Sequence, residues 1–396
     1  MREDEGPDQF KKQQFNSAKI HTMKKFKVGI LGATGMVGQN YIRLLEKHPW
    51  FDVVYLAASA NSAGVTYEES VKNRWQMSTP IPEKVKKIIV EDVANINKAV
   101  KKCDFVFSAF ELNDKPARPH EGSGAGGNLV KEMEEKYATT GIPVVSNASA
   151  NRWSDDVPML IPEINSEHLK MIKIQQKNHD WDKGFIVVKP NCSLQSYITP
   201  IYALIQAGYP VKKIIITTLQ AVSGAGYPGV ASLDVVDNVI PFIGGEEEKT
   251  EEEPLKILGE IKNNKFIKNK NISISATCTR VPVTDGHLAC VNILFKDKKP
   301  TKEKIIKIWN NFKSIPQELK LPFAPLFPII YKEEENRPQP KKDRDNDKGM
   351  AVTVGRLRDC KIFDYKFIAL SHNTVRGAAG GGILNAELLV KKKFIK

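Results

Sequence analysis

The first half of the chain alternates short apolar runs with stretches of helical spacing. Apolar runs cover residues 26–31 and 51–58, and a helical pattern between them extends to about residue 48. Strands that alternate with helices in this way are typical of a doubly wound parallel sheet. The pattern therefore predicts a Rossmann-like α/β domain. Further strands of this sheet are expected at 88–90, 105–107 and 144–146.

The pattern changes after residue 192, where longer strands predict an α+β domain with a mixed sheet. Residues 331–348 are polar and are expected to form a long connection. A glycine-rich turn that begins near Thr374 leads into a final helix, which is expected to return to the first domain. The strands of the mixed sheet are expected at 214–220, 272–281, 288–295 and 350–357.

Composition narrows the class of protein. With 396 residues, of which 41% are hydrophobic and 27% charged, the chain is long enough for two domains of ordinary globular composition. It contains no run of 18 apolar residues, and its polar segment 1–23 lacks the apolar core of a secretion signal. We therefore expect a disordered tail at 1–23, no membrane partner and a cytoplasmic location. Five cysteines at scattered spacings form neither a disulfide framework nor a metal signature, so no metal is expected.

The net charge of +13 fits either a nucleic-acid-binding protein or one whose ligands are small anions. The lysines are spread over the expected helical surfaces, with few aromatic residues among them. Basic grooves that bind nucleic acid are usually interleaved with aromatic side chains. We therefore expect a small-molecule, phosphorylated ligand and no nucleic-acid partner.

Glycines recur every third residue where the first strand ends, at Gly29, Gly32, Gly35 and Gly38. Glycine lets a backbone approach a pyrophosphate closely at a tight turn, and the helix that follows offers its N-terminus to the negative charge. The spacing is a near relative of G-x-G-x-x-G, and the alternative is a packing turn in an unrelated α/β fold. We expect a dinucleotide to be bound by Gly32, Thr34, Gly35, Met36 and Val37.

The loop after the second strand indicates which dinucleotide is bound. NAD enzymes place an acidic residue there to hold the ribose hydroxyls, but residues 57–64 contain none and the first acid is Glu68. Ser59, Asn61 and Ser62 can donate hydrogen bonds to a 2′-phosphate instead. The sequence therefore favours NADP.

Cys192 is the candidate nucleophile. An apolar run at 185–188 leads into it, and apolar residues from Leu194 follow at helical spacing until Gly208. The N–H groups and dipole of a helix N-terminus favour an anion, so we expect the Cys192 thiol to ionise more easily than a free thiol and to attack a carbonyl. The alternative is a small buried cysteine that only packs.

His287 is the candidate for proton transfer, because it follows a turn at 284–286 and because imidazole titrates near neutral pH. Arg280 is a candidate for binding a carboxylate through its planar guanidinium. The alternatives are a surface histidine and an ordinary ion pair. In a regular hairpin closed at 284–286, Arg280 and His287 would point to opposite faces. Pro282 cannot donate to a ladder, so a kink or a bulge there is expected to bring them together.

Six motifs occur in order along the chain, and together they resemble the aspartate-β-semialdehyde dehydrogenase family, especially its archaeal and fungal branch, from about residue 24 to the end. The resemblance implies the NADPH-dependent, reversible conversion of L-aspartyl 4-phosphate to L-aspartate 4-semialdehyde with release of phosphate. This reaction belongs to the biosynthesis of lysine, threonine and methionine. The motifs are GATGMVG (32–38), PNCS (190–193), VSGAG (222–226), GGEEEK (244–249), Arg280 with His287, and NTVRGAAG (373–380).

The resemblance also assigns the catalytic steps. Cys192 is implied to form a thioester with the acyl group. The backbone N–H of Cys192 or Ser193, with the side chain of Asn191, is implied to stabilise the oxyanion. His287 is implied to move protons.

Binding roles follow from the same resemblance. Arg280 is implied to bind the α-carboxylate of the substrate, Glu246 its amino group and Lys249 the phosphate, although an exposed charged helix start also explains the acidic run. Gln195 is implied to orient the acyl group; otherwise it is only a polar helix position. The residues implied to contact the nicotinamide end are Ser223, Gly224 and Asn373.

Two features depart from the family pattern. The branch often carries an arginine where this chain has Asn61, which leaves a 2′-phosphate without a charged partner there. The segment 113–127 is longer than expected. A glycine cluster at 121–128 within this region lacks the Lys-Ser/Thr ending of a phosphate-binding loop, and we expect it to be a mobile loop.

The expected organisation has a dinucleotide-binding domain (24–190 with 372–396) and a catalytic and dimerisation domain (191–371), in a homodimer or homotetramer. An acyl-CoA reductase, such as one acting on malonyl-CoA, is the nearest alternative on this scaffold. A reductase of N-acetylglutamyl phosphate is a second enzyme alternative. A non-catalytic dinucleotide-sensing protein is an alternative of another class.

Overall fold

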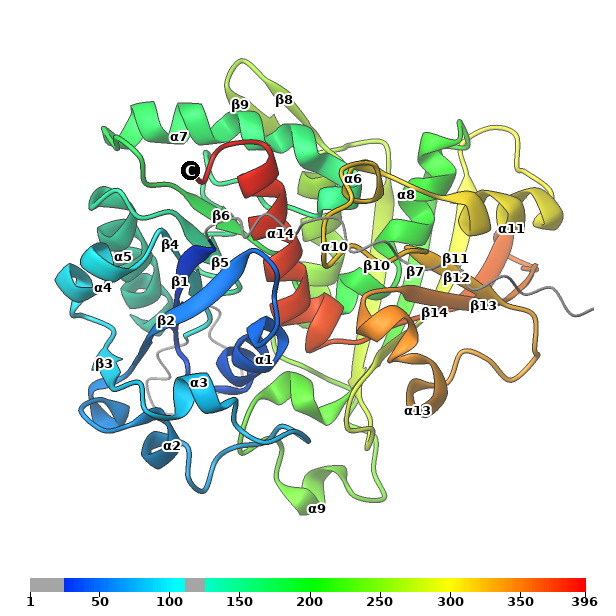
Figure 1. Ribbon diagram of the computed structural model, residues 1–396. Helices are drawn as coiled ribbons and strands as arrows, with labels where there is room; N and C mark the ends of the chain where they lie inside the picture. Colours follow the sequence, from blue (N-terminus) through cyan, green and yellow to red (C-terminus); the bar gives the residue numbers. More distant parts are fainter. Residues whose placement is uncertain (1–24, 111–124) are drawn as a thin grey trace, which may run out of the picture.

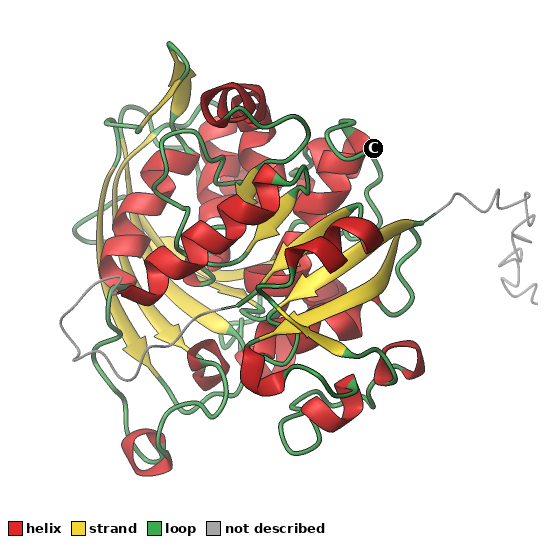
Figure 2. Cartoon of the chain, turned by 90° about the vertical axis from the view of Figure 1, so that its left-hand side faces the viewer, coloured by secondary structure: helices red, strands yellow, loops and turns green. Residues whose placement is uncertain are grey.

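The computed structural model describes residues 25–110 and 125–396. The expected tail at 1–23 and residues 121–124 of the glycine cluster lie outside the described residues. Two large sheets organise the described part of the chain, and Figure 2 shows their strands flanked by helices. No helix in the described ranges is long and apolar enough to cross a membrane.

The first sheet consists of six parallel strands. They are β1 (Phe26–Leu31), β2 (Phe51–Ala58), β3 (Val90–Asp92), β4 (Phe105–Ser108), β5 (Val144–Ser146) and β6 (Ile186–Val188). Their order, β3-β2-β1-β4-β5-β6, is that of a Rossmann domain. The prediction of a Rossmann-like domain is confirmed, although the strand expected at 88–90 begins at Val90.

Helices cover both faces of this sheet, which explains why β4 and β5 are buried along their whole length. One hydrophobic core joins the sheet to α4 (Ile96–Lys102) and α5 (Ala125–Thr139). A second core joins the opposite face to α1 (Met36–Leu45) and α14 (Gly380–Lys391).

The second sheet is mixed, as the sequence predicts. Its strands are β7 (Val211–Gln220), β10 (Ser273–Arg280), β11 (His287–Phe295), β12 (Ile329–Lys332), β13 (Val352–Asp359) and β14 (Tyr365–Ser371). They follow the order β10-β7-β11-β14-β13-β12, with β10 parallel to β7, β12 parallel to β13, and the other pairs antiparallel. Helices α8 (Ile198–Gln206) and α11 (Lys302–Asn311) pack on one face. On the other face Thr217, Cys290 and Ile368 lie side by side and remain partly exposed.

Two strands of this sheet were not expected from the sequence. β12 overlaps the start of the segment predicted as a polar connection (331–348), which also contains the short helices α13 (Pro340–Asp343) and η5 (Asn346–Gly349). β14 lies between β11 and β13. β12 has only four residues, and the places of both strands in the sheet are defined by their pairing partners, which a local pattern does not reveal.

The end of the chain returns to the first sheet. One turn of π-helix, η6 (Val375–Ala379), leads into α14, which lies beside α1 and β5 (Figure 1). The remaining helices and the β-hairpin are η1 (Ala60–Ser62), α2 (Tyr67–Ser70), α3 (Glu83–Lys86), α6 (Pro162–Asn165), η2 (Ser166–Lys170), α7 (Met171–His179), η3 (Ser193–Ser196), η4 (Val222–Ala225), α9 (Ser232–Val235), α10 (Glu246–Ile257), β8 (Glu260–Lys262), β9 (Lys265–Ile267) and α12 (Ile315–Glu318).

Candidate active site

Cys192 lies on the turn between β6 and η3, where it caps the short 3₁₀ helix. Its Sγ atom is 3.4 Å from Nε2 of His287, the first residue of β11. Gly377 of η6 packs against the same turn, and a Cβ at that position would lie 2.9 Å from the Cβ of Cys192. The structure therefore brings together two candidate residues that are 95 positions apart in the sequence.

The hydrogen bonds of His287 define which ring nitrogen carries the proton. The backbone N–H of Ala221 donates to Nδ1 at 3.0 Å, so Nδ1 is the acceptor and the proton of the neutral ring lies on Nε2. Burial and the charge of Arg280 lower the pKa of His287 to about 3, which keeps the ring neutral. His287 therefore presents an N–H donor to the sulfur of Cys192.

The expectation of an easily ionised thiol is wrong for this state of the protein. Burial, together with the carboxylate of Glu246, raises the pKa of Cys192 to about 11. The nearby cations, among them Lys189, act in the opposite direction but do not compensate. The helix after Cys192 has only four residues, so its dipole is small.

Arg280 and His287 lie on the same side of the sheet, since both are level with Gln220 of β7, and the link between them turns tightly at Pro282, where the Val283 N–H donates to Val281 O at 2.7 Å. The two strands do not form a hairpin, because β7 lies between them. Arg280 pairs with Gln220 of β7, and Leu288 pairs with Leu219, which places His287 level with Gln220 as well. The guanidinium and the imidazole both approach Gly224, and Arg280 Nη1 donates to Ala221 O at 2.8 Å. The hairpin expectation was wrong because the sequence does not reveal the strand inserted between them.

A polar cluster surrounds Asn191, next to the nucleophile. Its Nδ2 atom donates to both oxygens of Glu246, at 2.8 and 3.1 Å, and Lys249 Nζ lies 3.3 Å from the same carboxylate. The Oδ1 atom of Asn191 accepts the backbone N–H of Ser193 at 2.7 Å. Since that N–H is already engaged, the backbone N–H of Cys192 is the better candidate for an oxyanion donor.

Two polar residues near the nucleophile were not singled out from the sequence. These residues are Gln220 and Lys189. Gln220 Nε2 donates to Glu246 at 3.2 Å. Lys189 lines a small cavity together with Gln195, which was expected from the sequence. Lys189 directly precedes the PNCS motif, and burial lowers the pKa of its ammonium group to about 7. The sequence contained only one indication that these residues belong to the site, which is their position at strand ends. Gln220 is the last residue of β7, and Lys189 is a charged residue directly after the buried strand β6.

The glycine turn after β1 fits a dinucleotide. Gly32 has a φ of +79°, and a Cβ there would lie 2.6 Å from the carbonyl of Ala109. A side chain on Gly38 would collide with the Gly32 carbonyl. Gly35 caps α1 without any side-chain hydrogen bond, so the helix begins with N–H groups that no cap occupies. Such a helix start fits a pyrophosphate. Thr34 precedes it and is buried, whereas Met36 and Val37 begin the helix and are partly exposed.

The loop after β2 carries the residues expected to meet a 2′-phosphate. Ser59 and Asn61 are exposed and Ser62 is buried, all at the carboxyl end of β2 in or next to η1. Ligands of open α/β sheets bind at this edge.

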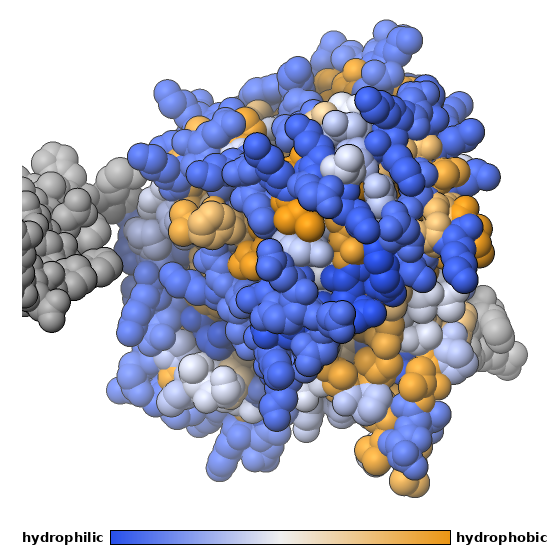
Figure 3. Space-filling model, turned by 90° about the vertical axis from the view of Figure 1, so that its right-hand side faces the viewer, coloured by the Kyte–Doolittle hydropathy of each residue, from blue (hydrophilic) through white to orange (hydrophobic). Residues whose placement is uncertain are grey.

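The expected nicotinamide contacts also come together. Asn373 Nδ2 donates to Ser223 Oγ at 2.8 Å, and Asn373 Oδ1 accepts the N–H of Gly286. Ser223 and Met36 both line a cavity of about 860 Å³ between α1 and the segment that carries α9. This segment has exposed apolar side chains, and orange residues gather at the lower edge of Figure 3, the height at which α9 lies in Figure 1.

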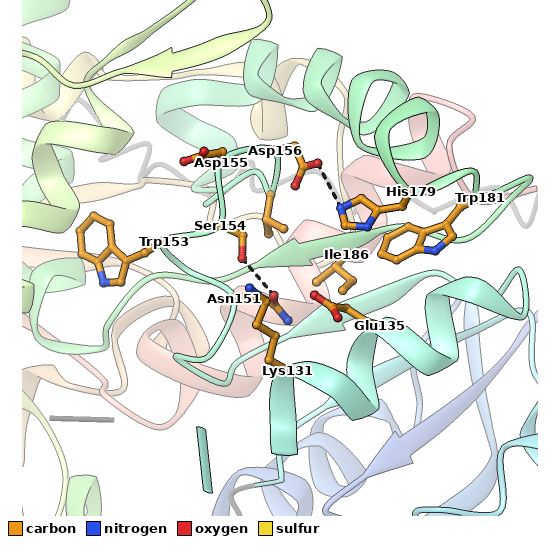
Figure 4. A pocket seen from close by; sticks show the side chains of 11 residues that line it. Lys131, Glu135, Asn151, Trp153, Ser154, Asp155, Asp156, His179, Trp181 and Ile186 are labelled. Atoms are coloured by element: carbon orange, nitrogen blue, oxygen red, sulfur yellow. Dashed lines mark hydrogen bonds and ion pairs between the residues drawn. The ribbon is translucent and has the colours of Figure 1, made fainter. Parts of the chain in front are cut away.

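A further pocket of about 340 Å³ lies away from these residues (Figure 4). Trp153, Asp156, His179 and Trp181 line it, and His179 pairs with Asp156 at 3.2 Å. It contains none of the site residues expected from the sequence. Within the described ranges, no cluster of three or more His, Cys, Asp or Glu residues is arranged to hold a metal ion.

The last strand of a Rossmann sheet leads to a cysteine, which meets a histidine of the mixed sheet beside a polar cluster. This arrangement defines a dinucleotide-dependent oxidoreductase with a cysteine nucleophile. Residues 27–172 match the family described as semialdehyde dehydrogenase, NAD binding domain, and residues 201–376 match semialdehyde dehydrogenase, dimerisation domain. The chain belongs to the aspartate-semialdehyde dehydrogenase family, as the sequence motifs indicate.

Relatives and solved structures agree with this assignment. The aspartate-semialdehyde dehydrogenase of Archaeoglobus fulgidus is 44% identical over 94% of this chain and all of its own length. The enzyme of the same name from Schizosaccharomyces pombe is 43% identical over 92% of this chain and 98% of its own. The structure of the Candida albicans enzyme with NADP superposes with a TM-score of 0.83 at 35% identity, covering 94% of this chain and 100% of that one.

Proposed function

We propose that this protein catalyses the reversible, NADPH-dependent reductive dephosphorylation of L-aspartyl 4-phosphate to L-aspartate 4-semialdehyde, in the biosynthesis of lysine, threonine and methionine. The observation that carries the proposal is the 3.4 Å contact between Cys192 Sγ and His287 Nε2, beside Arg280 and the Asn191 cluster. The chain also matches relatives named aspartate-semialdehyde dehydrogenase over nearly their full length.

Substrate binding uses charged groups of both signs close to the nucleophile. Arg280 binds the α-carboxylate, since a guanidinium matches a carboxylate with two hydrogen bonds. Glu246 binds the amino group, and Lys249, which is 32% exposed in its side chain, binds the phosphate. Asn191 and Gln220 hold Glu246 in place through their amides. Gln195, three residues after the nucleophile, orients the acyl group.

The chemistry begins with attack of the Cys192 sulfur on the acyl phosphate, which breaks the bond between the acyl group and phosphate and leaves a thioester on the enzyme, while the thiol proton leaves with the phosphate as hydrogen phosphate. The Cys192 N–H stabilises the oxyanion, and the Nε2–H of His287 donates to the sulfur when it carries negative charge. After reduction, the same donor assists departure of the sulfur as the thiohemiacetal collapses to the aldehyde. Nε2 accepts the thiol proton only if the ring first gives up its hydrogen bond from Ala221.

The cofactor site is proposed at the turn after β1 and the loop after β2. Gly32, Thr34, Gly35, Met36 and Val37 hold the pyrophosphate, and Ser59, Asn61 and Ser62 hold the 2′-phosphate of NADP. Ser223, Gly224 and Asn373 position the nicotinamide end near Cys192. When bound, NADPH supplies the hydride that reduces the thioester.

The proposed domains keep their expected boundaries: 24–190 with 372–396, and 191–371. We propose that the second domain forms a homodimer through the uncovered face of its sheet, around Thr217, Cys290 and Ile368. The dimerisation family model spans these strands, and a second copy would cover their half-exposed side chains. A cytoplasmic location fits a protein whose five cysteines are all free thiols.

The decisive experiment measures the reverse reaction, the oxidation of L-aspartate 4-semialdehyde by NADP⁺. Oxidation that requires phosphate or arsenate supports the proposal, whereas oxidation that proceeds only with CoA indicates an acyl-CoA reductase. Cys192→Ala is expected to bind NADPH normally and to lose turnover. Turnover that survives in Cys192→Ala would refute the role of the cysteine.

A further inference from the structure

A buried ion pair joins the two family-matched parts of the chain directly beneath the nucleophile turn. Arg152 follows β5 in the dinucleotide-binding part, and Glu253 lies on α10 in the dimerisation part. Arg152 Nη1 is 2.8 Å from Glu253 Oε1, and the two side chains are 9% and 0% exposed.

Both partners of this pair also hold the backbone that leads into Cys192. Arg152 Nε donates to the carbonyl of Lys189 at 3.2 Å, and Glu253 Oε2 accepts the N–H of Asn191 at 2.6 Å. The residue between them is a proline, which has no N–H of its own. The three residues before the nucleophile are therefore held from two sides by one ion pair.

Helix α10 ties this ion pair to the substrate cluster. Glu246 and Glu253 are seven residues apart, two helical turns, and so share a face of α10. Glu246 binds the side chain of Asn191, whereas Glu253 binds its backbone. Lys256 of the same helix donates to three carbonyls of the loop that carries Arg152, including that of Arg152 itself at 2.7 Å.

We propose that Arg152 and Glu253 are positioning residues for Cys192: they fix the 189–191 backbone so that the sulfur meets the acyl carbon and His287 at the reactive angle. This inference rests on the function proposed above. A buried ion pair adds little net stability compared with apolar packing, so stability alone does not explain the arrangement. A nucleophile displaced by about 1 Å is expected to react about 100-fold more slowly.

The electrostatic setting supports the same role. The charged groups that act on the Cys192 thiol are Glu246, Lys189, Arg152 and Arg280. The Arg152 guanidinium holds the pKa of the thiol below the value that burial and Glu246 alone would give. Replacing Arg152 with a neutral residue is therefore expected to raise the pKa of the thiol further.

The test compares Glu253→Gln and Arg152→Lys with a matched control, Glu387→Gln. Glu387 is also fully buried, accepts a backbone N–H from Phe323 and meets a basic side chain, His48, but these residues lie outside the proposed site. We expect both test variants to lose about 100-fold in kcat, with KM for the semialdehyde and NADPH affinity within threefold of wild type. The control is expected to keep its kcat.

Alkylation of Cys192 by iodoacetamide, followed against pH by mass spectrometry, supplies a readout that needs no substrate. We expect Arg152→Gln to shift the alkylation profile to higher pH and the control to leave it unchanged. Arg152→Lys keeps the charge and is the variant least disturbed in folding. A folded Arg152→Lys or Glu253→Gln with wild-type kcat, or with a changed KM and unchanged kcat, overturns the positioning role. A wild-type enzyme without phosphate-dependent activity refutes the proposed function instead.

Discussion

The backbone N–H of Ala221 donates to Nδ1 of His287 at 3.0 Å, and this contact places the ring proton on Nε2, facing the sulfur of Cys192. A backbone N–H donates but does not accept a hydrogen bond, so the direction of this hydrogen bond is fixed. The pair is thus a neutral imidazole donor beside a protonated thiol, rather than an imidazolium–thiolate pair.

The protonation of His287 can be observed directly. Because burial and Arg280 lower its pKa to about 3, the ring is expected to remain neutral from pH 6 to pH 9. In ¹⁵N-labelled enzyme, Nε2 should give the signal of a protonated nitrogen and Nδ1 that of an unprotonated one. A titration of this ring with a midpoint near pH 6.5 would contradict the assignment.

The reactivity of Cys192 should increase with pH over an unusually wide range. Only the thiolate reacts with iodoacetamide, and the pKa of the thiol is raised to about 11. The alkylation rate of the ligand-free enzyme is therefore expected to rise about tenfold per pH unit from pH 7 to pH 10, without a plateau. A plateau beginning below pH 8 would show that the thiol is already ionised.

Arg280→Lys tests the proposed recognition of the α-carboxylate. Lysine keeps the positive charge but loses the planar pair of N–H donors and the fixed hydrogen bond to Ala221 O. We expect KM for the semialdehyde to rise by about tenfold or more, corresponding to about 1.4 kcal/mol. The affinity for NADPH, measured by fluorescence titration, serves as the control and should not change.

Asn61→Asp tests the proposed 2′-phosphate site. Asn61 is exposed at the end of β2, where a carboxylate repels a phosphate and accepts the ribose hydroxyls of NAD. The variant is expected to raise KM for NADPH about tenfold while leaving or lowering KM for NADH. Equal effects on both cofactors would place the 2′-phosphate elsewhere.

Gly377→Ala tests the packing behind the nucleophile. The new Cβ would lie 2.9 Å from the Cβ of Cys192, so either η6 or the nucleophile turn must move. Such overpacking costs about 1–3 kcal/mol. We expect a lower melting temperature and a kcat reduced by about 100-fold, as for a nucleophile displaced by about 1 Å. A variant with reduced stability and full activity would show that only η6 moves.

The local parts of the site were predictable because their signals lie within a few residues. The glycine turn is recognisable from the spacing of four glycines between Gly29 and Gly38. Cys192 is recognisable because it follows an apolar run that forms a buried strand. The side on which Arg280 and His287 meet was not predictable, because it depends on the insertion of β7 between their strands. The strand β14 likewise depends on its neighbours β11 and β13.

The pKa values and contacts of the site residues could not be predicted from the sequence, because they depend on side chains that are distant in the sequence. The raised pKa of Cys192 comes from burial and from Glu246, which is 54 residues away in the sequence. Gln220 and Lys189 are recognised as part of the site only from their surroundings: Gln220 donates to Glu246, and Lys189 is buried near Cys192. A single sequence identifies which side chains carry chemistry more readily than it identifies their protonation states.

The return of the chain from η6 to α14 has a consequence for biogenesis. Gly377, which packs against the nucleophile turn, and α14, which completes one layer over the first sheet, follow Cys192 and His287 in the sequence and are synthesised after them. A nascent chain on the ribosome therefore carries Cys192 through the synthesis of residues 193–376 without a finished catalytic centre. The catalytic centre is therefore complete only once η6 and α14 have emerged and packed against it.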